Sequence, residues 1–217
     1  RISEEMVLKK GAKPAFKGYR GYPATLCTSI NEVIIHGIPG ERRLAEGDII
    51  GIDVGAIKND FYGDTAVTYA VGAVTPAAQS LMDTAKQALY NAIDQARAGG
   101  RLYDISAAIQ TTAEAAGYSC VREFVGHGIG RALHEDPQIP NVGKKGTGPR
   151  LEEGMTLAID VLARLPPDFA PKPVAYAPDH VDIGMRGTLP LLTRLTCRFP
   201  ARGLQMMTRI GAYPRPD

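Results

Sequence analysis

Two of the chain's four histidines, His127 and His134, lie seven residues apart in the segment GHGIGRALHEDP. Three glycines stand around the first of them: Gly126, Gly128 and Gly130. Such glycines can form a tight turn, because a residue without Cβ adopts unusual backbone angles. They can also let backbone and solvent approach the imidazole ring, as a metal ligand or a substrate-binding histidine requires. The choice depends on what the fold brings to His127.

Two aspartates are candidates for that place. Asp53 interrupts the apolar run IIGIDVGAI, and Asp64 follows eleven residues later. In an antiparallel hairpin closed by a two- or four-residue loop, this odd spacing puts both side chains on one face. If they are directly opposed, around a turn centred between Lys58 and Asn59, their Cβ atoms lie about 5 Å apart.

Two like charges at that separation disfavour the sheet unless a cation bridges them, and a pair of divalent ions is a common solution. His127 would complete a mixed oxygen and nitrogen site suited to manganese, iron, cobalt or zinc. In the alternative reading, Asp64 is a turn residue and Asp53 is exposed on an edge strand.

Hydrophobic periodicity predicts the elements that position these residues. Apolar and polar residues alternate over 48–57 and 63–74, around the turn-forming KNDFYG, which indicates a hairpin. Two amphipathic helices follow, over 76–97 and 103–116, each ended by glycine. Two further strands are expected over 121–130 and 155–163. The order of strands, helices and strands predicts an α+β fold.

Composition excludes several classes of protein. With 217 residues and 44% hydrophobic content, the chain can bury a substantial core. The net charge is +2, so no overall field favours nucleic acid or a membrane surface. No apolar run is long enough for a membrane span or a secretory signal, so a cytoplasmic location is expected. Three widely spaced cysteines, Cys27, Cys120 and Cys197, are expected to be reduced thiols.

The composition changes near residue 160. Residues 161–217 hold nine of the sixteen prolines and carry a net charge of +4, whereas residues 1–160 carry −2. Proline at that density interrupts helices and strands, and no clear period runs through the segment. We therefore expect a domain over 1–160 and a divergent, Pro/Arg-rich tail over 161–217 that adds no strand to the sheet. A linker or interaction tail is the ordinary explanation for such composition.

The motifs together resemble those of a known family. The segments NEVIIHGIP (31–39), IDVGAIKNDFYGDT (52–65), GHGIGRALHEDP (126–137) and EGMTLAI (153–159), with GYRGYPATLCTSINEV (18–33), are similar in order and spacing to type I methionine aminopeptidases. These are dinuclear metallopeptidases with the pita-bread (creatinase/aminopeptidase-like) fold. The resemblance covers roughly residues 10 to 160.

The resemblance implies a role for each matching residue. The metal ligands would be Asp53, Asp64 and His127, holding two divalent ions of cobalt, manganese, iron or zinc. His36 and His134 would act on the substrate in catalysis. The pocket for the methionine side chain would include Tyr19, Tyr22 and Cys27, although each of these, taken alone, is also an ordinary core residue.

The implied activity is removal of the N-terminal methionine from nascent proteins by a monomer in the cytoplasm. The implied partners are a peptide or nascent chain and the ribosome, with no nucleic acid and no membrane. Two alternatives stay open. One is an inactive remnant that binds peptide N-termini without cleaving them, and the other is a proline dipeptidase of the same fold.

The sequence also departs from the family. Where the family supplies a first C-terminal glutamate ligand, this chain has Asp160, which is the fourth candidate metal ligand. The E-H-T segment that supplies a second glutamate is missing. His180 follows Asp179 in no matching context and is interpreted as a loop histidine. The family's tryptophan is absent, and only RISEEMVLKK stands where the family has N-terminal helices, so the fold is expected to be incomplete at both ends. The match ends abruptly at Ile159, which indicates either a reading-frame shift or a genuinely divergent tail.

Overall fold

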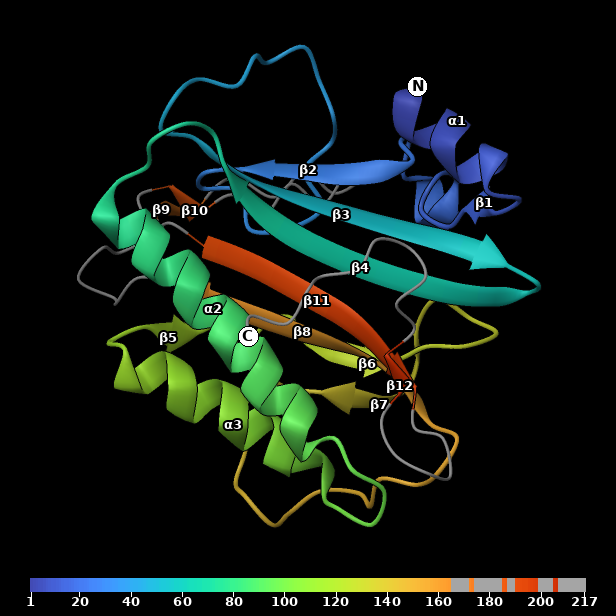
Figure 1. The fold of residues 1–217 in the computed structure, drawn as a ribbon, viewed down its shortest axis with the longest axis vertical. Coiled ribbons are helices and arrows are strands. Elements are labelled where there is room, and N and C mark those ends of the chain that lie inside the picture. Colours follow the sequence, from blue (N-terminus) through green and yellow to red (C-terminus); the bar gives the residue numbers. More distant parts are fainter. Residues whose placement is uncertain (165–171, 174–184, 187–189, 199–204, 207–217) are drawn as a thin grey trace.

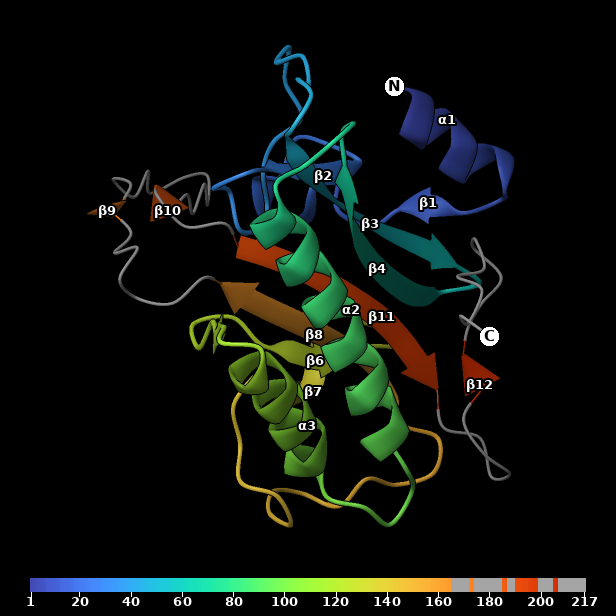
Figure 2. The same ribbon diagram turned by 60° about the vertical axis from the view of Figure 1, so that its left-hand side comes forward.

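The computed structural model describes residues 1–164, 172–173, 185–186, 190–198 and 205–206. A large, curved sheet carries two long helices, α2 and α3, on one face (Figure 1). Figure 2 shows these two helices together in front of the sheet, with the N-terminal helix α1 at a separate corner. Strands precede and follow the helix pair, so the predicted α+β class is confirmed. No helix among the described residues is long and apolar enough to cross a membrane.

The strands of the large sheet run in the order β1-β3-β4-β11-β8-β6-β7. Three further strands join at its sides, since β2 pairs with β3, β5 with β8, and β12 with β11. The bounds are β1 Lys13–Pro14, β2 Leu26–Ile30, β3 Ile49–Lys58, β4 Phe61–Ala70, β5 Ser119–Cys120, β6 Gly126–Gly128, β7 Glu135–Ile139, β8 Thr156–Arg164, β11 Pro190–Arg198 and β12 Gln205–Met206. A separate two-stranded pair consists of β9 Lys172–Pro173 and β10 Met185–Arg186.

The predicted hairpin is confirmed as β3 and β4, but its register differs from the expectation. Lys58 pairs with Phe61, so the turn is Asn59–Asp60, and both of these residues have positive φ, 52° and 63°. Two residues with positive φ form the turn that best matches the twist of a hairpin, and Asn and Asp tolerate this conformation better than most residues. The turn therefore lies one residue further along the chain than predicted.

The helices bury one face each against the sheet. Helix α2 (Pro76–Gln95) begins at Thr75, whose side chain accepts a hydrogen bond from the Ala78 N–H, and has proline in its first turn. Helix α3 (Leu102–Ala115) ends before Gly117, which has φ 81°. Together with β8 they enclose the largest core cluster, which includes Leu81, Leu89, Ile105, Ile109, Leu157 and Ile159. Both predicted helices are thereby confirmed to within two residues.

Strand β8 separates this core from the opposite face of the sheet. Leu157, Ile159 and Val161 belong to the helix-side cluster, and Ala158 belongs to a second cluster on the other side. Because side chains alternate along a strand, Asp160 shares the face of Ala158. It is only 2% exposed. A strand buried on both faces reads as a nearly continuous apolar run, which is the pattern of TLAIDVLA.

The prediction that residues 161–217 add nothing to the sheet is wrong for three stretches. Strand β8 continues to Arg164, and β12 pairs with β11 at the side of the sheet. Strand β11 lies inside the sheet, paired with β8 along Pro190–Arg198 and with β4 at Arg194 and Leu195. Its one proline, Pro190, is the first residue of the strand, where a missing N–H is tolerated. The domain boundary at residue 160 itself stays a prediction, and His180 lies outside the described residues.

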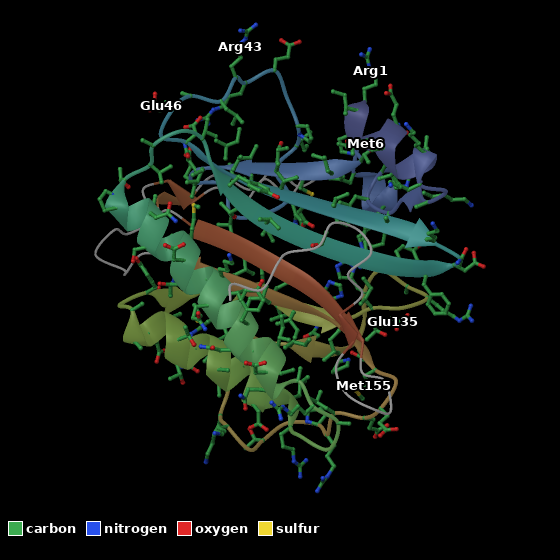
Figure 3. All side chains as sticks on the ribbon, in the orientation of Figure 1. Arg1, Met6, Arg43, Glu46, Glu135 and Met155 are labelled. Atoms are coloured by element: carbon green, nitrogen blue, oxygen red, sulfur yellow. The ribbon has the colours of Figure 1, made fainter. Side chains whose placement is uncertain are left out.

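The N-terminal segment forms more structure than expected. RISEEMVLKK contains helix α1 (Ile2–Lys9), which has no buried residue, and a short 3₁₀ turn, η1 (Tyr19–Gly21), follows β1. Ile2 and Met6 are 71% and 61% exposed, and Met6 is labelled on this helix in Figure 3.

Candidate metal centre

The register of four strands places the candidate acidic residues on one face of the sheet. Asp53 on β3 pairs with Ala66 on β4, and Asp64 pairs with Gly55. The two aspartates are therefore diagonal neighbours on one face, and the expectation that they are directly opposed is wrong. On the far side of β4, Ala66 pairs with Arg194 of β11, and Arg194 pairs with Asp160 of β8.

His127 joins this face from β6. It pairs with Ala158, two residues before Asp160 on the same side of β8. The curvature of the sheet brings its Nε2 atom to 3.9 Å from Oδ2 of Asp64, although three strand-to-strand steps separate β4 from β6. Asp53, Asp64 and His127 are 3%, 3% and 4% exposed. The reading of Asp53 and Asp64 as an exposed edge residue and a turn residue is thereby wrong.

The glycines around His127 serve close packing between strands. A Cβ atom on Gly126 would lie 2.5 Å from the carbonyl oxygen of Ala158, and one on Gly128 would lie 2.2 Å from that of Asp136. Gly126, Gly128 and Gly130 are not among the glycines with positive φ, so the tight-turn reading is wrong. The backbones of β7 and β8 approach β6 closely at these positions, which holds His127 between them.

His134 lies beside His127. Their ring centroids are 4.3 Å apart, and the Tyr19 hydroxyl lies 3.0 Å from Nδ1 of His134. The structure therefore brings together three residues that were predicted from separate motifs, on η1, on β6 and in the loop before β7.

Tyr19, Tyr22 and Cys27 pack in one cluster with residues next to the carboxylates. The cluster contains Ala158, the partner of His127, and Cys27 is the direct partner of Asp53 across β2 and β3. The Tyr22 hydroxyl donates to the carbonyl oxygens of Leu26 and Gly37. Burial, with the neighbouring Cys27 side chain, raises the pKa of Tyr22 well above its usual value, so the phenol is neutral.

Cys120, like Cys27, forms no disulfide among the described residues. It lies in the helix-side core, and burial raises the pKa of its thiol to about 11. An unreactive, protonated thiol is therefore expected there.

His36 is the sixth residue of the loop that joins β2 to β3. It has φ 60° and meets the ring of Phe124 edge to face, with ring centroids 6.5 Å apart. The next residue, Gly37, accepts a hydrogen bond from the Thr28 N–H and lies so close to that strand that a Cβ would be 2.2 Å from the Thr28 carbonyl oxygen. Phe124 was missed by sequence reasoning, because a single aromatic residue in VREFVG gives no positional signal.

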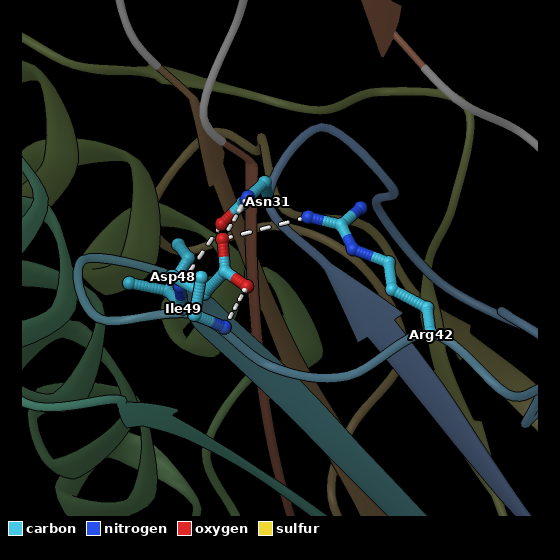
Figure 4. A network of polar contacts seen from close by, with 5 residues as sticks. Asn31, Arg42, Asp48 and Ile49 are labelled. Carbon is cyan, nitrogen blue, oxygen red and sulfur yellow. Dashed lines mark hydrogen bonds and ion pairs between the residues drawn. The ribbon is translucent and has the colours of Figure 1, made fainter.

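Asp48 holds the two ends of this loop together (Figure 4). Its carboxylate accepts hydrogen bonds from the Asn31 amide at 2.7 Å and the Ala45 N–H at 2.9 Å, and the Arg42 guanidinium lies 3.4 Å away. Asn31 in turn accepts from the Ile49 N–H. Arg43 and Glu46 extend into solvent from the outer part of the loop (Figure 3). Sequence reasoning also missed this network.

The chemistry of the donor set suits a divalent metal ion. Buried carboxylate oxygens and an imidazole nitrogen are ligands for manganese, iron, cobalt and zinc. Asp64 and His127 approach each other as two ligands of one ion would. Within the described part of the chain, however, no three His, Cys, Asp or Glu side chains form a group that could hold an ion. Asp53 and Asp160 share the face of that pair without completing such a group.

Comparison with known proteins identifies the family. The sequence model of metallopeptidase family M24 matches residues 1–185, which is most of the chain and extends past Ile159. The chain belongs to metallopeptidase family M24. Metal use is therefore a property of its family. The similarity to the family therefore continues beyond Ile159, the residue at which the recognisable motifs end.

Individual relatives agree with this assignment. Methionine aminopeptidase from Clostridium acetobutylicum is 50% identical over 161 residues, which is 74% of this chain and 64% of that protein. The crystal structure of methionine aminopeptidase from Rickettsia prowazekii superimposes with a TM-score of 0.88 at 35% identity, covering 94% of this chain and 82% of that one. The resemblance to type I methionine aminopeptidases and the pita-bread fold are thus confirmed.

The similarity to prolidases is weaker. Prolidase from Pyrococcus furiosus superimposes with a TM-score of 0.63 at 21% identity, over 85% of this chain and 48% of that one, which shows a common fold. The chain spans less than two thirds of the length of the curated relative described above.

Proposed function

We propose that this M24 chain removes the N-terminal methionine from peptides and nascent proteins by metal-assisted hydrolysis of the first peptide bond. The observation that carries this proposal is the approach of buried Asp64 to buried His127, 3.9 Å apart, beside the cluster of Tyr19, Tyr22 and Cys27. In this reading Asp64 and His127 hold a divalent ion, and Asp53 and Asp160 add carboxylates for a second. When bound, such ions activate water and polarise a carbonyl group.

The histidines act on the substrate. His134 orients the scissile peptide, and His36 stabilises the negative charge that develops on the carbonyl oxygen. An imidazole N–H aimed at that oxygen interacts more strongly as charge grows there, so it favours the transition state over the bound substrate.

The tyrosine and cysteine cluster forms the pocket for the methionine side chain. Aromatic rings and a polarizable thiol make favourable contacts with a thioether, which is itself soft and unbranched. Tyr22 contributes a fixed ring, because its hydroxyl is already bonded to two backbone carbonyls. This pocket would favour an unbranched apolar side chain over a charged one.

The remaining aspects of the proposal follow the same resemblance. We infer a cytoplasmic monomer that acts on chains emerging from the ribosome, with cobalt, manganese, iron or zinc as the ions.

The test is release of methionine from a Met-Ala-Ser peptide with added Co²⁺ or Mn²⁺. Methionine release by the chain, lost in His127→Ala, supports the proposal. Binding of the peptide with no release supports the inactive remnant instead. Cleavage of an Ala-Pro dipeptide, with Met-Ala-Ser left intact, supports a proline dipeptidase. Gln138→Ala, at the position that pairs with His127 on β7, is the matched control.

A further inference from the structure

The ring of His134 has two aromatic neighbours. Its centroid is 4.3 Å from that of His127 and 5.6 Å from that of Tyr19. The Tyr19 hydroxyl reaches Nδ1 of His134 at 3.0 Å, a normal hydrogen-bond distance. One nitrogen of the ring is thus engaged by a specific hydroxyl group.

A strained turn places Tyr19 in this position. Three residues around it have left-handed backbone angles: Gly18 (φ 86°), Arg20 (φ 48°) and Gly21 (φ 82°). Arg20 has a Cβ atom, so this conformation is unfavourable for it and is retained only where the surroundings impose it. The turn is closed by hydrogen bonds between Gly18 and Tyr22 and between Tyr22 and Tyr19, and the Arg20 guanidinium lies 5.5 Å above the Tyr19 ring.

The loop that carries His134 is also fixed. The Gly130 carbonyl accepts from the Tyr62 N–H on β4 at 2.8 Å, and the Ala132 N–H donates to the Glu135 carboxylate at 2.8 Å. The Arg131 guanidinium lies 5.0 Å above the ring of Phe61 at the hairpin end. Because the backbones on both sides are held, the contact of Tyr19 with His134 joins two fixed segments.

We propose that Tyr19 is a positioning residue: its hydroxyl donates to Nδ1 of neutral His134 and so keeps the ring proton on Nε2. A phenol is a better donor than acceptor, because its oxygen lone pair is delocalised into the ring, and the unprotonated imidazole nitrogen is a strong acceptor. The hydrogen bond at one ring nitrogen decides which tautomer is present, and thereby which nitrogen can donate to a substrate.

This inference deepens the proposed function, on which its consequence for catalysis rests. In that function His134 orients the scissile peptide, which requires a ring of fixed direction and a proton on the nitrogen that faces the substrate. Tyr19 then affects the rate through His134 and not only through contact with the methionine side chain.

The test is the side-chain ¹⁵N spectrum of the metal-free chain, recorded about two pH units above the ordinary histidine pKa of about 6.5. The chain has four histidines, so His134→Asn assigns the signals. We expect Nδ1 of His134 to resonate as an unprotonated, hydrogen-bonded nitrogen. In Tyr19→Phe, which keeps the ring, this signal should move downfield. Tyr62→Phe, in the same cluster, should leave it unchanged.

Two outcomes would overturn the proposal. One is a proton on Nδ1 of His134 in the unchanged chain, and the other is a signal that is the same with and without the Tyr19 hydroxyl. Both are read without catalysis, so they are independent of whether methionine is released. Where release is observed, Tyr19→Phe should lower kcat roughly tenfold and change KM less, since the pocket keeps its ring.

Discussion

At the scale of single residues, burial distinguishes the candidate ligands from ordinary surface aspartates. Asp53, Asp64 and Asp160 are each at most 3% exposed. A carboxylate is rarely buried unless it is paired or binds a cation, because removal of its hydration is costly. Three carboxylates buried on one face therefore need hydrogen-bond donors or positive charge nearby, and the divalent ions of the proposed function would supply positive charge.

The first prediction concerns Asp64. Replacement by Asn removes the negative charge that faces His127 and keeps the shape of the side chain. We expect Asp64→Asn to weaken Mn²⁺ or Co²⁺ binding by roughly ten- to a hundredfold or more, as measured by titration calorimetry. Asp60→Asn, in the turn of the same hairpin, is the control and should bind like the unchanged chain. Equal affinity in both variants would contradict the assignment of Asp64 as a ligand.

The second prediction concerns Asp48. The backbone hydrogen bond from Ala45, and then the Asn31 amide, lower the pKa of Asp48 below its usual value. A lowered folded-state pKa stabilises the fold above the unfolded value of about 3.9, and that contribution is lost as the pH falls through the folded pKa. We expect Asp48→Asn to lower the urea midpoint at neutral pH, and this difference to shrink below about pH 4.

The comparison for this prediction is Asp83→Asn, an exposed substitution on α2. Its urea midpoint should follow that of the unchanged chain from neutral to acidic pH. A difference between Asp48→Asn and the unchanged chain that stays constant over the whole range would show that the loop network does not depend on the Asp48 charge.

At the scale of elements, the sequence predicts the hairpin and its common face but not the register. The odd separation of Asp53 and Asp64 is enough to place them on one face. Direct opposition of the two aspartates requires a turn centred between Lys58 and Asn59, whereas the chemistry of the turn favours Asn59–Asp60, the two adjacent residues that best tolerate positive φ. Turn residues are thus better guides to register than candidate ligands are.

The third prediction follows from this turn. Asn59 has φ 52°, and a β-branched residue there would be strained. We expect Asn59→Val to lower the free energy of unfolding by about 1–2 kcal/mol in urea denaturation, and Asn59→Gly to leave it unchanged or slightly raised. Equal effects of the two substitutions would show that the backbone conformation of the turn contributes nothing to stability.

At the scale of the whole molecule, one face of the sheet contributes to the core and the other carries the candidate site. Helices α2 and α3 cover one face of the sheet (Figure 2). That face holds the largest core cluster, and the opposite face holds the candidate ligands. Separating them lets the helices stabilise β8 from one side while Asp160 lies on the other. The predicted order of elements was sufficient for this architecture, because the helix pair between strands must pack on the sheet.

Strand β11 could not be predicted from the average composition of residues 161–217. Over the whole segment prolines obscure any period, yet within RLTCR the apolar residues Leu195 and Cys197 alternate with the polar residues Arg194, Thr196 and Arg198. This short period of two is the signal that averaging concealed. Strand β11 also pairs with β4 on one side and with β8 on the other, and this pairing favours a strand more than the β-propensity of its own residues does.

The last prediction concerns the row that β11 completes. Asp53, Ala66, Arg194 and Asp160 pair in succession across four strands, so an arginine stands at the register position beside Asp160, and the family resemblance implies a glutamate ligand at the position of Asp160 itself. Removing a positive charge from the position beside a carboxylate favours binding of a cation there, and Asp160 is one methylene shorter than glutamate, a difference in reach of about 1.5 Å. We expect the double variant Arg194→Glu, Asp160→Glu to bind Mn²⁺ at least roughly tenfold more tightly than the unchanged chain and to release methionine from Met-Ala-Ser faster. Arg198→Glu makes the same charge change four residues further along β11, opposite Thr156, and should alter neither property. Titration calorimetry and methionine release, with circular dichroism to verify folding, decide the matter: a double variant that folds but binds no better than Arg198→Glu would show that this row of residues is not part of the metal centre.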